Sequence, residues 1–133
     1  MEKFYYRRLE VYKNSKILII DIHNLLKEFP TEEKYALCDQ IHRASISITS
    51  NIAEAFGRYS DKERIHFLDI SNGSLMEVSS QIEMAHDLNY ISDDMLENID
   101  NQVLTIAKQL AKLRTKIANN NPQTPNTYHP CIK

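Results

Sequence analysis

The stretch LCDQIHRASISITSNIAEAFGRYSDKE, residues 37–63, decides the fold, because it holds one helical pattern, its end and the start of the next. Gly57 is a residue type common just after a helix C-terminus, and Ser60 with Glu63 has the form of a capping box that opens a new helix. Apolar residues recur every three or four positions before that glycine and keep to one helix face, namely Leu37, Ile41, Ala44, Ile48, Ile52 and Ala55.

The same pattern occurs in the rest of the chain, and it predicts helices at about residues 8–29, 32–57, 61–88 and 93–118. Pro30 ends the first helix, Thr31 is the expected N-cap of the second, and Ser92 is the expected N-cap of the fourth. The fourth has an unbroken apolar row formed by Leu96, Ile99, Val103, Ile106, Leu110, Leu113 and Ile117.

Connections of a few residues leave no room for crossovers, so the four helices must run up, down, up and down. We therefore predict an all-α, antiparallel four-helix bundle over residues 1–118, followed by a disordered polar tail at 119–133 that is rich in Asn and Pro. A coiled-coil dimer of longer helices is the alternative. The breaks at Pro30, Gly57 and Asn89 argue against it.

Composition gives few clues to function. The chain has 133 residues, 26% of them charged, and a net charge of -2, which fits one soluble domain without a generally basic surface. No apolar run is long enough to span a bilayer and no secretory signal is evident, so we expect a cytoplasmic protein. Cys38 and Cys131 form neither a CxxC motif nor a paired framework.

Catalytic and metal-binding patterns are also missing from the sequence. The five histidines lack HExxH spacing, and Glu54 and Glu77 are too far apart on facing helices to act as a carboxylate pair. No glycine-rich phosphate loop follows a strand. We expect neither an enzyme nor a bound cofactor or metal.

A polar stripe runs down the second helix, and small or polar residues of the third helix face it. Antiparallel pairing about the turn at Tyr59 predicts that Arg43 lies near Glu77, Ser47 near Ser71 and Glu54 near Arg64. Gly73, which costs about 1 kcal/mol relative to Ala in a helix, predicts close approach of another backbone. The predicted stripe and its partners are Gln40, Arg43, Ser47, Asn51, Glu54, Gly73, Ser74 and Glu77.

Either a solvated face or a hydrogen-bonded seam between subunits would explain this stripe, and we favour the seam. The run at 17–20 also favours a seam, because the core needs only Leu18 from it and leaves Ile17, Ile19 and Ile20 without a role inside the subunit. They indicate a partner subunit, although scattered surface isoleucines are the simpler alternative. These three residues are included in the predicted seam.

The segment QIHRASISITSNIAEAFGRYSDKERIHFLDISNGSLMEVSSQI, residues 40–82, resembles the four-helix bundle proteins of intervening sequences in bacterial large-subunit rRNA genes. The shared features are an Arg-Ala-x-x-Ser-Ile-x-x-Asn-Ile-Ala-Glu run and a later Gly-Ser-Leu-x-Glu, and the likeness extends over about residues 7–118. Ala55 departs from the usual glycine, and Thr49 stands where a small residue or proline is common.

This resemblance implies a homopentameric antiparallel bundle with a mostly unassigned function. A related branch, the accessory variability determinant proteins of diversity-generating retroelements, works with a reverse transcriptase and RNA. That branch is notably basic, whereas this chain is not.

The predicted topology separates the charges. One end of the bundle, which we call the basic pole, brings together the start of the first helix, the turn between the second and third, and the end of the fourth. Helix dipoles do not explain cations at the start of the first helix, where they are disfavoured. The candidate nucleic-acid-binding residues at this pole are Arg7, Arg8, Lys13, Arg58, Lys62, Arg64, Lys112, Arg114 and Lys116.

Tyrosines lie among these cations and offer stacking surfaces beside phosphate-binding groups. They also suit a simpler role, stapling the first helix to its neighbours. We interpret the chain as a non-enzymatic oligomeric bundle that binds RNA or a nucleoprotein through the basic pole. The alternative is a protein-interaction scaffold that docks partners on Ile17, Ile19 and Ile20.

Overall fold

The computed structural model describes residues 2–119. Over that range the chain forms four long helices, two short 3-10 turns and no strand. The elements are η1 (Tyr5–Arg8), α1 (Glu10–Leu26), η2 (Thr31–Glu33), α2 (Leu37–Ala55), α3 (Asp61–Asp87) and α4 (Asp93–Ala118). The predicted tail falls outside the described residues except for Asn119, which is the C-cap of α4.

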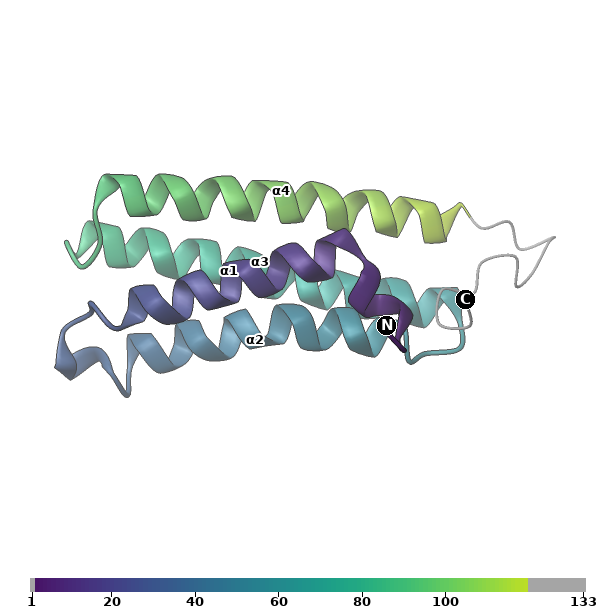
Figure 1. Ribbon diagram of the computed structural model, residues 1–133, viewed down its shortest axis with the longest axis horizontal. Helices are drawn as coiled ribbons and strands as arrows, with labels where there is room; N and C mark the ends of the chain where they lie inside the picture. Colours follow the sequence, from purple (N-terminus) through teal and green to yellow (C-terminus); the bar gives the residue numbers. More distant parts are fainter. Residues whose placement is uncertain (1, 120–133) are drawn as a thin grey trace.

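The four helices lie side by side and alternate in direction, with their connections at the two ends of the molecule (Figure 1). Each helix packs against the next in the chain, and α1 also packs against α4, which closes the ring of four. This arrangement is the up-and-down four-helix bundle that the short connections predict. The alternative of a coiled coil of longer helices is wrong.

The core is built from the apolar rows identified in the sequence. Each fully buried aliphatic side chain contributes about 1.5–3 kcal/mol through removal from water. Two buried serines interrupt these rows, and both hydroxyls are hydrogen-bonded. Ser15 donates to the Val11 carbonyl at 2.7 Å and Ser71 donates to the Ile48 carbonyl at 2.8 Å. The fully buried residues include Leu18, Ile22, Ile41, Ile48, Ile52, Leu68, Leu75, Val78, Ile82, Ile99, Ile106 and Ile117.

The predicted bounds of the third and fourth helices are confirmed to within a residue, since their caps are read directly from the sequence. Ser60 accepts a hydrogen bond from the Glu63 backbone N–H at 3.1 Å, and Ser92 accepts one from that of Met95 at 3.2 Å. Gly57 lies just beyond the end of α2, where its backbone N–H donates to the Glu54 carbonyl at 3.0 Å.

The first two helices are shorter than predicted. Leu9 is extended, so residues before Glu10 form the separate turn η1, and α1 ends at Leu26 instead of 29. Thr31 is not an N-cap, because it lies within η2. The helix α2 starts at Leu37 instead of 32, because Ala36 leaves the helical region at φ -118° and ψ -99°.

Candidate nucleic-acid interface

Three parts of the chain meet at the basic pole, as the topology requires. In Figure 1 the N-terminal turn η1, the connection between α2 and α3, and the end of α4 all lie toward the same end of the bundle. Seven of the predicted cations are exposed there: Arg7, Arg8, Lys13, Lys62, Lys112, Arg114 and Lys116.

The arginines of η1 lie over aromatic rings. The Arg7 guanidinium is 5.0 Å from the centroid of the Phe4 ring and 5.7 Å from that of Tyr6. The Arg8 guanidinium is 5.5 Å from the centroid of the Tyr5 ring. Cations at such distances are attracted to the ring faces, so η1 holds two positive charges against an aromatic surface.

The same aromatic residues staple η1 to the bundle, which confirms the simpler role predicted for them. The Tyr5 ring meets the Phe56 ring edge-on at 5.7 Å, and Tyr6 meets Tyr12 edge-on at 5.0 Å. Partial burial raises the pKa of the Tyr12 phenol. Tyr59 differs from them, because it is 94% exposed on the α2–α3 connection.

Ion pairs hold several cations of the basic pole. Arg7 pairs with Glu2 at 3.5 Å and Lys13 with Glu10 at 3.7 Å, and two arginines of the long helices are paired as well. Arg58 bonds Glu54 one turn back on α2, and its guanidinium lies 4.6 Å from the centroid of the Phe67 ring. Arg114 on α4 donates to both carboxylate oxygens of Asp69 on α3, at 2.7 and 3.2 Å. These hydrogen bonds raise the pKa of Arg114. Both arginines are oriented by the bundle, and their charge is partly neutralised.

Arg64 does not belong to this surface, so its prediction as a nucleic-acid-binding residue is corrected. Its side chain is only 3% exposed, with Nη1 2.7 Å from Asp61 one turn earlier on α3. The reason is its place in the core-facing row of α3, one turn before Leu68 and two before Ser71.

A hollow of about 550 Å³ lies between η1 and the last turns of α2. The helical patterns of the sequence do not predict it, although the aromatic run FYY at 4–6 is a signal that could have indicated it. Its lining residues include Phe4, Phe56 and Tyr59. It therefore adds an aromatic recess to the basic pole.

The polar stripe forms hydrogen bonds between α2 and α3 near the expected register. The hydroxyls of Ser47 and Ser74 are 2.8 Å apart, and the Asn51 amide donates to both the carbonyl and the hydroxyl of Ser47 at 2.8 and 2.9 Å. Ser71 bonds the residue that follows Ser47. Part of the stripe therefore joins two helices of one subunit.

The charged pairs expected across the stripe are not formed. Arg43 pairs with Asp39 on its own helix at 3.2 Å, and Glu77 accepts from Gln81 at 3.3 Å. Glu54 and Arg64 likewise bond residues of their own helices. Residues three or four apart on one helix are closer neighbours than residues on facing helices, so each of these side chains, including the buried Arg64, pairs within its own helix.

Other seam candidates face outward. A Cβ atom added at Gly73 meets nothing within 4 Å, so the expected close approach of another backbone does not occur within this chain. Gln40 is exposed, Ile17 and Ile20 are 54% and 59% exposed, and Ile19 is half-buried. These positions are open to a partner but meet none within the subunit.

Other classes of site find no support in residues 2–119. No group of three or more His, Cys, Asp or Glu side chains in that range is placed to hold a metal ion. Within the same range, no helix combines the length and apolar character that crossing a membrane requires.

The fold and the polarised surface define a compact antiparallel helical bundle with a cationic, aromatic end. A family model for the 23S rRNA-intervening sequence protein matches residues 7–112, and the chain therefore belongs to that family. This confirms the resemblance seen in residues 40–82.

Solved structures resemble this chain, and one of them is similar over most of its length. It is a protein of unknown function from the S23 ribosomal protein family of Bacteroides thetaiotaomicron, with a TM-score of 0.72 and 30% identity. The match covers 78% of this chain and 97% of the other. A comparison with curated proteins found no match.

Proposed function

We propose that this protein binds RNA, free or within a nucleoprotein, through the basic pole and performs no catalysis. The observation that carries the proposal is the placement of Arg7 and Arg8, exposed beside aromatic rings just before a helix start. The dipole of α1 disfavours cations there. Contacts with aromatic rings and the ion pair of Arg7 with Glu2 at 3.5 Å hold the two arginines in place, and both remain exposed. Exposed cations held in this way suit a phosphate ligand.

The pole collects cations from three separate elements. Lys62 lies in the first turn of α3 and Lys112 and Lys116 in the last turns of α4, all exposed. Each cation that neutralises a phosphate releases counterions, so affinity should fall steeply as salt rises. The opposite end of the bundle would repel the same ligand, because acidic residues gather there in η2 and in the first turns of α2 and α4: Glu32, Glu33, Asp39, Asp93 and Asp94.

A matched pair of variants tests the proposal. Arg7→Gln with Arg8→Gln removes two charges from the basic pole, and Lys27→Gln with Lys34→Gln removes two from the other end. Binding of a fluorescent single-stranded RNA is measured by anisotropy between about 50 and 200 mM salt, a range in which phosphate contacts weaken strongly. We expect the first variant to bind more weakly with a shallower salt slope, and the second to match the wild type. Equal binding and equal slopes for all three proteins would refute the proposal.

We also propose that the subunit forms a homo-oligomer, a pentamer by the resemblance described above, through the outer face of α2 and α3 and the exposed isoleucines of α1. The open position of Gly73 and the exposure of Ile17 and Ile20 support this assembly. Repeating the basic pole around a ring would multiply weak RNA contacts. Light scattering after size exclusion measures the subunit number, and a monomer at all concentrations would contradict the proposal.

The alternative is a scaffold that binds a protein partner on the isoleucines. The two functions differ in their response to salt, because apolar docking is insensitive to ionic strength and phosphate binding is not. A partner retained at high salt by a variant that lacks Arg7 and Arg8 would favour the scaffold.

A further inference from the structure

The hollow at the basic pole has an aromatic lining that the fold does not need to expose. Phe4 is 53% exposed and Tyr59 is 94% exposed, while Phe56 is buried and anchors η1 through Tyr5. The hollow measures about 550 Å³ and opens between η1 and the last turns of α2. Exposed aromatic rings on both sides of a recess form a surface suited to a flat, apolar ligand face.

The cations at this hollow lie on the same rings. Arg7 is stacked over Phe4 and Tyr6, and Arg8 over Tyr5, at 5.0 to 5.7 Å from the ring centroids. Phe4, Tyr5 and Tyr6 also line the hollow, so the two guanidinium groups lie next to its η1 wall. An anionic group attached to a flat ring system satisfies both parts of this surface.

The polar groups of the hollow indicate which part of such a ligand enters. Ser50 and Glu54 lie in the lining, and the Glu54 side chain is 48% exposed. Glu54 is paired with Arg58, so its negative charge is partly neutralised, but its carboxylate can still accept a hydrogen bond from the N–H groups of a nucleobase, which a phosphate cannot donate. The base is thus favoured inside the hollow, and the phosphate is favoured outside it, at Arg7 and Arg8.

We propose that this hollow receives one unpaired base of a single-stranded RNA, stacked against Tyr59 and Phe4, while the adjoining phosphates contact Arg7 and Arg8. The inference rests on the proposed RNA-binding function and adds the class of RNA. Bases of a duplex are paired and stacked on one another, and their flat faces are not available to aromatic side chains. The protein should therefore prefer single-stranded RNA.

The test uses the full-length protein and three probes of equal length: an oligoadenylate, the same strand with abasic sugars, and an RNA duplex. Tyr59→Leu and Phe4→Leu each remove one ring from the hollow. Tyr35→Leu is the control, because Tyr35 is 86% exposed at the other end of the bundle. Circular dichroism and thermal melting check that every variant is folded.

We expect wild type and Tyr35→Leu to bind the intact strand about tenfold or more tighter than the abasic strand, which is the size of one base stacking on an aromatic ring. Tyr59→Leu and Phe4→Leu should lose most of that preference and leave duplex binding unchanged. An unaltered preference in both variants would overturn the inference. If the variant with both Arg7→Gln and Arg8→Gln nevertheless bound RNA more weakly, the proposed RNA-binding function would stand without a base in the hollow. Full binding by that variant would reject the proposed function itself.

Discussion

Arg64 is a cation placed where the sequence row of α3 requires an apolar residue. Its guanidinium bonds Asp61, but its Nε atom is buried without a hydrogen-bond partner. Burying an ionic group is costly, and replacing it with an apolar residue of similar volume is often neutral or stabilising by about 1–4 kcal/mol. Asp61 would keep a favourable place, because it lies in the first turn of α3, where the helix dipole stabilises a carboxylate.

We therefore expect Arg64→Met to keep or raise the free energy of unfolding and to leave RNA binding unchanged. Chemical denaturation measures the first quantity, and the anisotropy assay measures the second. Destabilisation by about 3 kcal/mol, the size associated with breaking a buried ion pair, would show that the pair with Asp61 is needed for the fold.

A single methyl group added at Gly73 tests whether α2 and α3 form the proposed subunit interface. It lies inside α3 with open space around it, so an alanine there should stabilise an isolated subunit by about 1 kcal/mol. If α2 and α3 form the subunit interface, the added methyl group also separates neighbouring subunits. We expect Gly73→Ala to melt at a higher temperature when dilute and to dissociate at a higher concentration than the wild type. Unchanged assembly would exclude this face as the interface.

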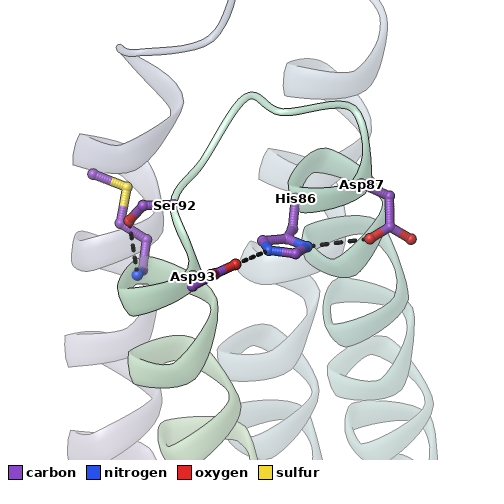
Figure 2. A network of polar contacts seen from close by, with 5 residues as sticks. His86, Asp87, Ser92 and Asp93 are labelled. Atoms are coloured by element: carbon purple, nitrogen blue, oxygen red, sulfur yellow. Dashed lines mark hydrogen bonds and ion pairs between the residues drawn. The ribbon is translucent and has the colours of Figure 1, made fainter.

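His86 links the end of α3 to the start of α4. Figure 2 shows its ring between two carboxylates, with Nε2 bonded to Asp93 and Nδ1 3.1 Å from Asp87. The hydrogen bond to Asp93, followed by that to Asp87, raises the pKa of His86 above its ordinary value of 6.5. Protonation is thus favoured in the folded state.

The sign of the pH effect follows from that raised pKa. The stabilisation is complete below the unfolded-state pKa and is lost as pH rises through the folded-state pKa, so the window lies above 6.5. We expect His86→Gln to be less stable than the wild type at acidic pH, and the two proteins to converge at alkaline pH. His66→Gln, at an exposed histidine of α3, is the control. Thermal melting across pH 5 to 9 checks this, and a constant difference between the proteins would contradict it.

Helix ends show which elements the sequence determines locally. Ser60 and Ser92 cap α3 and α4 with their own side chains, so both starts are predictable from a few residues. The starts of α1 and α2 are set by the backbone of Leu9 and Ala36, neither of which is a capping residue type. Where α1 and α2 start therefore depends on how η1 and η2 pack, and a local sequence pattern does not contain that information.

The end of α3 depends on Asn89, which adopts a left-handed conformation with φ of 66°. The Tyr90 backbone N–H then donates to the Ala85 carbonyl at 2.9 Å and the Asn89 N–H to that of His86 at 2.8 Å, the pairing of a Schellman motif. A left-handed conformation costs an ordinary L-residue about 1–2 kcal/mol and costs glycine almost nothing. We expect Asn89→Ala to destabilise the bundle by about 1 kcal/mol and Asn89→Gly to be neutral or stabilising, as measured by urea denaturation. The reverse order would mean that the Asn89 side chain, and not its backbone, stabilises this end.

For the whole molecule, the sequence predicts the bundle well and its candidate site only in part. Apolar rows and short connections are enough to give four antiparallel helices and a cationic end. Burial of Arg64 and the hollow beside Phe56 arise from how separate elements pack, which the rows do not describe. Local ion pairs such as Arg43 with Asp39 replace the expected pairs between helices, because residues four apart on one helix are closer neighbours than residues on facing helices.

The closed ring of helices makes a prediction about chain connectivity. An even number of alternating helices brings η1 and the end of α4 to the same end of the bundle, as Figure 1 shows, and α1 already packs against α4. Stability then depends on the packed faces and only weakly on which two helices are joined, because doubling the length of a flexible loop costs about 0.6 kcal/mol. Lys34 and Tyr35 are both exposed in the turn before α2, so the chain can be opened there.

We expect a circular permutant that begins at Tyr35, ends at Lys34 and joins the native ends through a flexible linker to keep its helix content. It should unfold in one cooperative transition, somewhat below the melting temperature of the native chain. The control carries the same linker as an insertion at Lys34 in the native order. If the permutant alone loses cooperativity, the connection from α1 to α2, and not the ring of packed faces, is what holds α1 in the bundle.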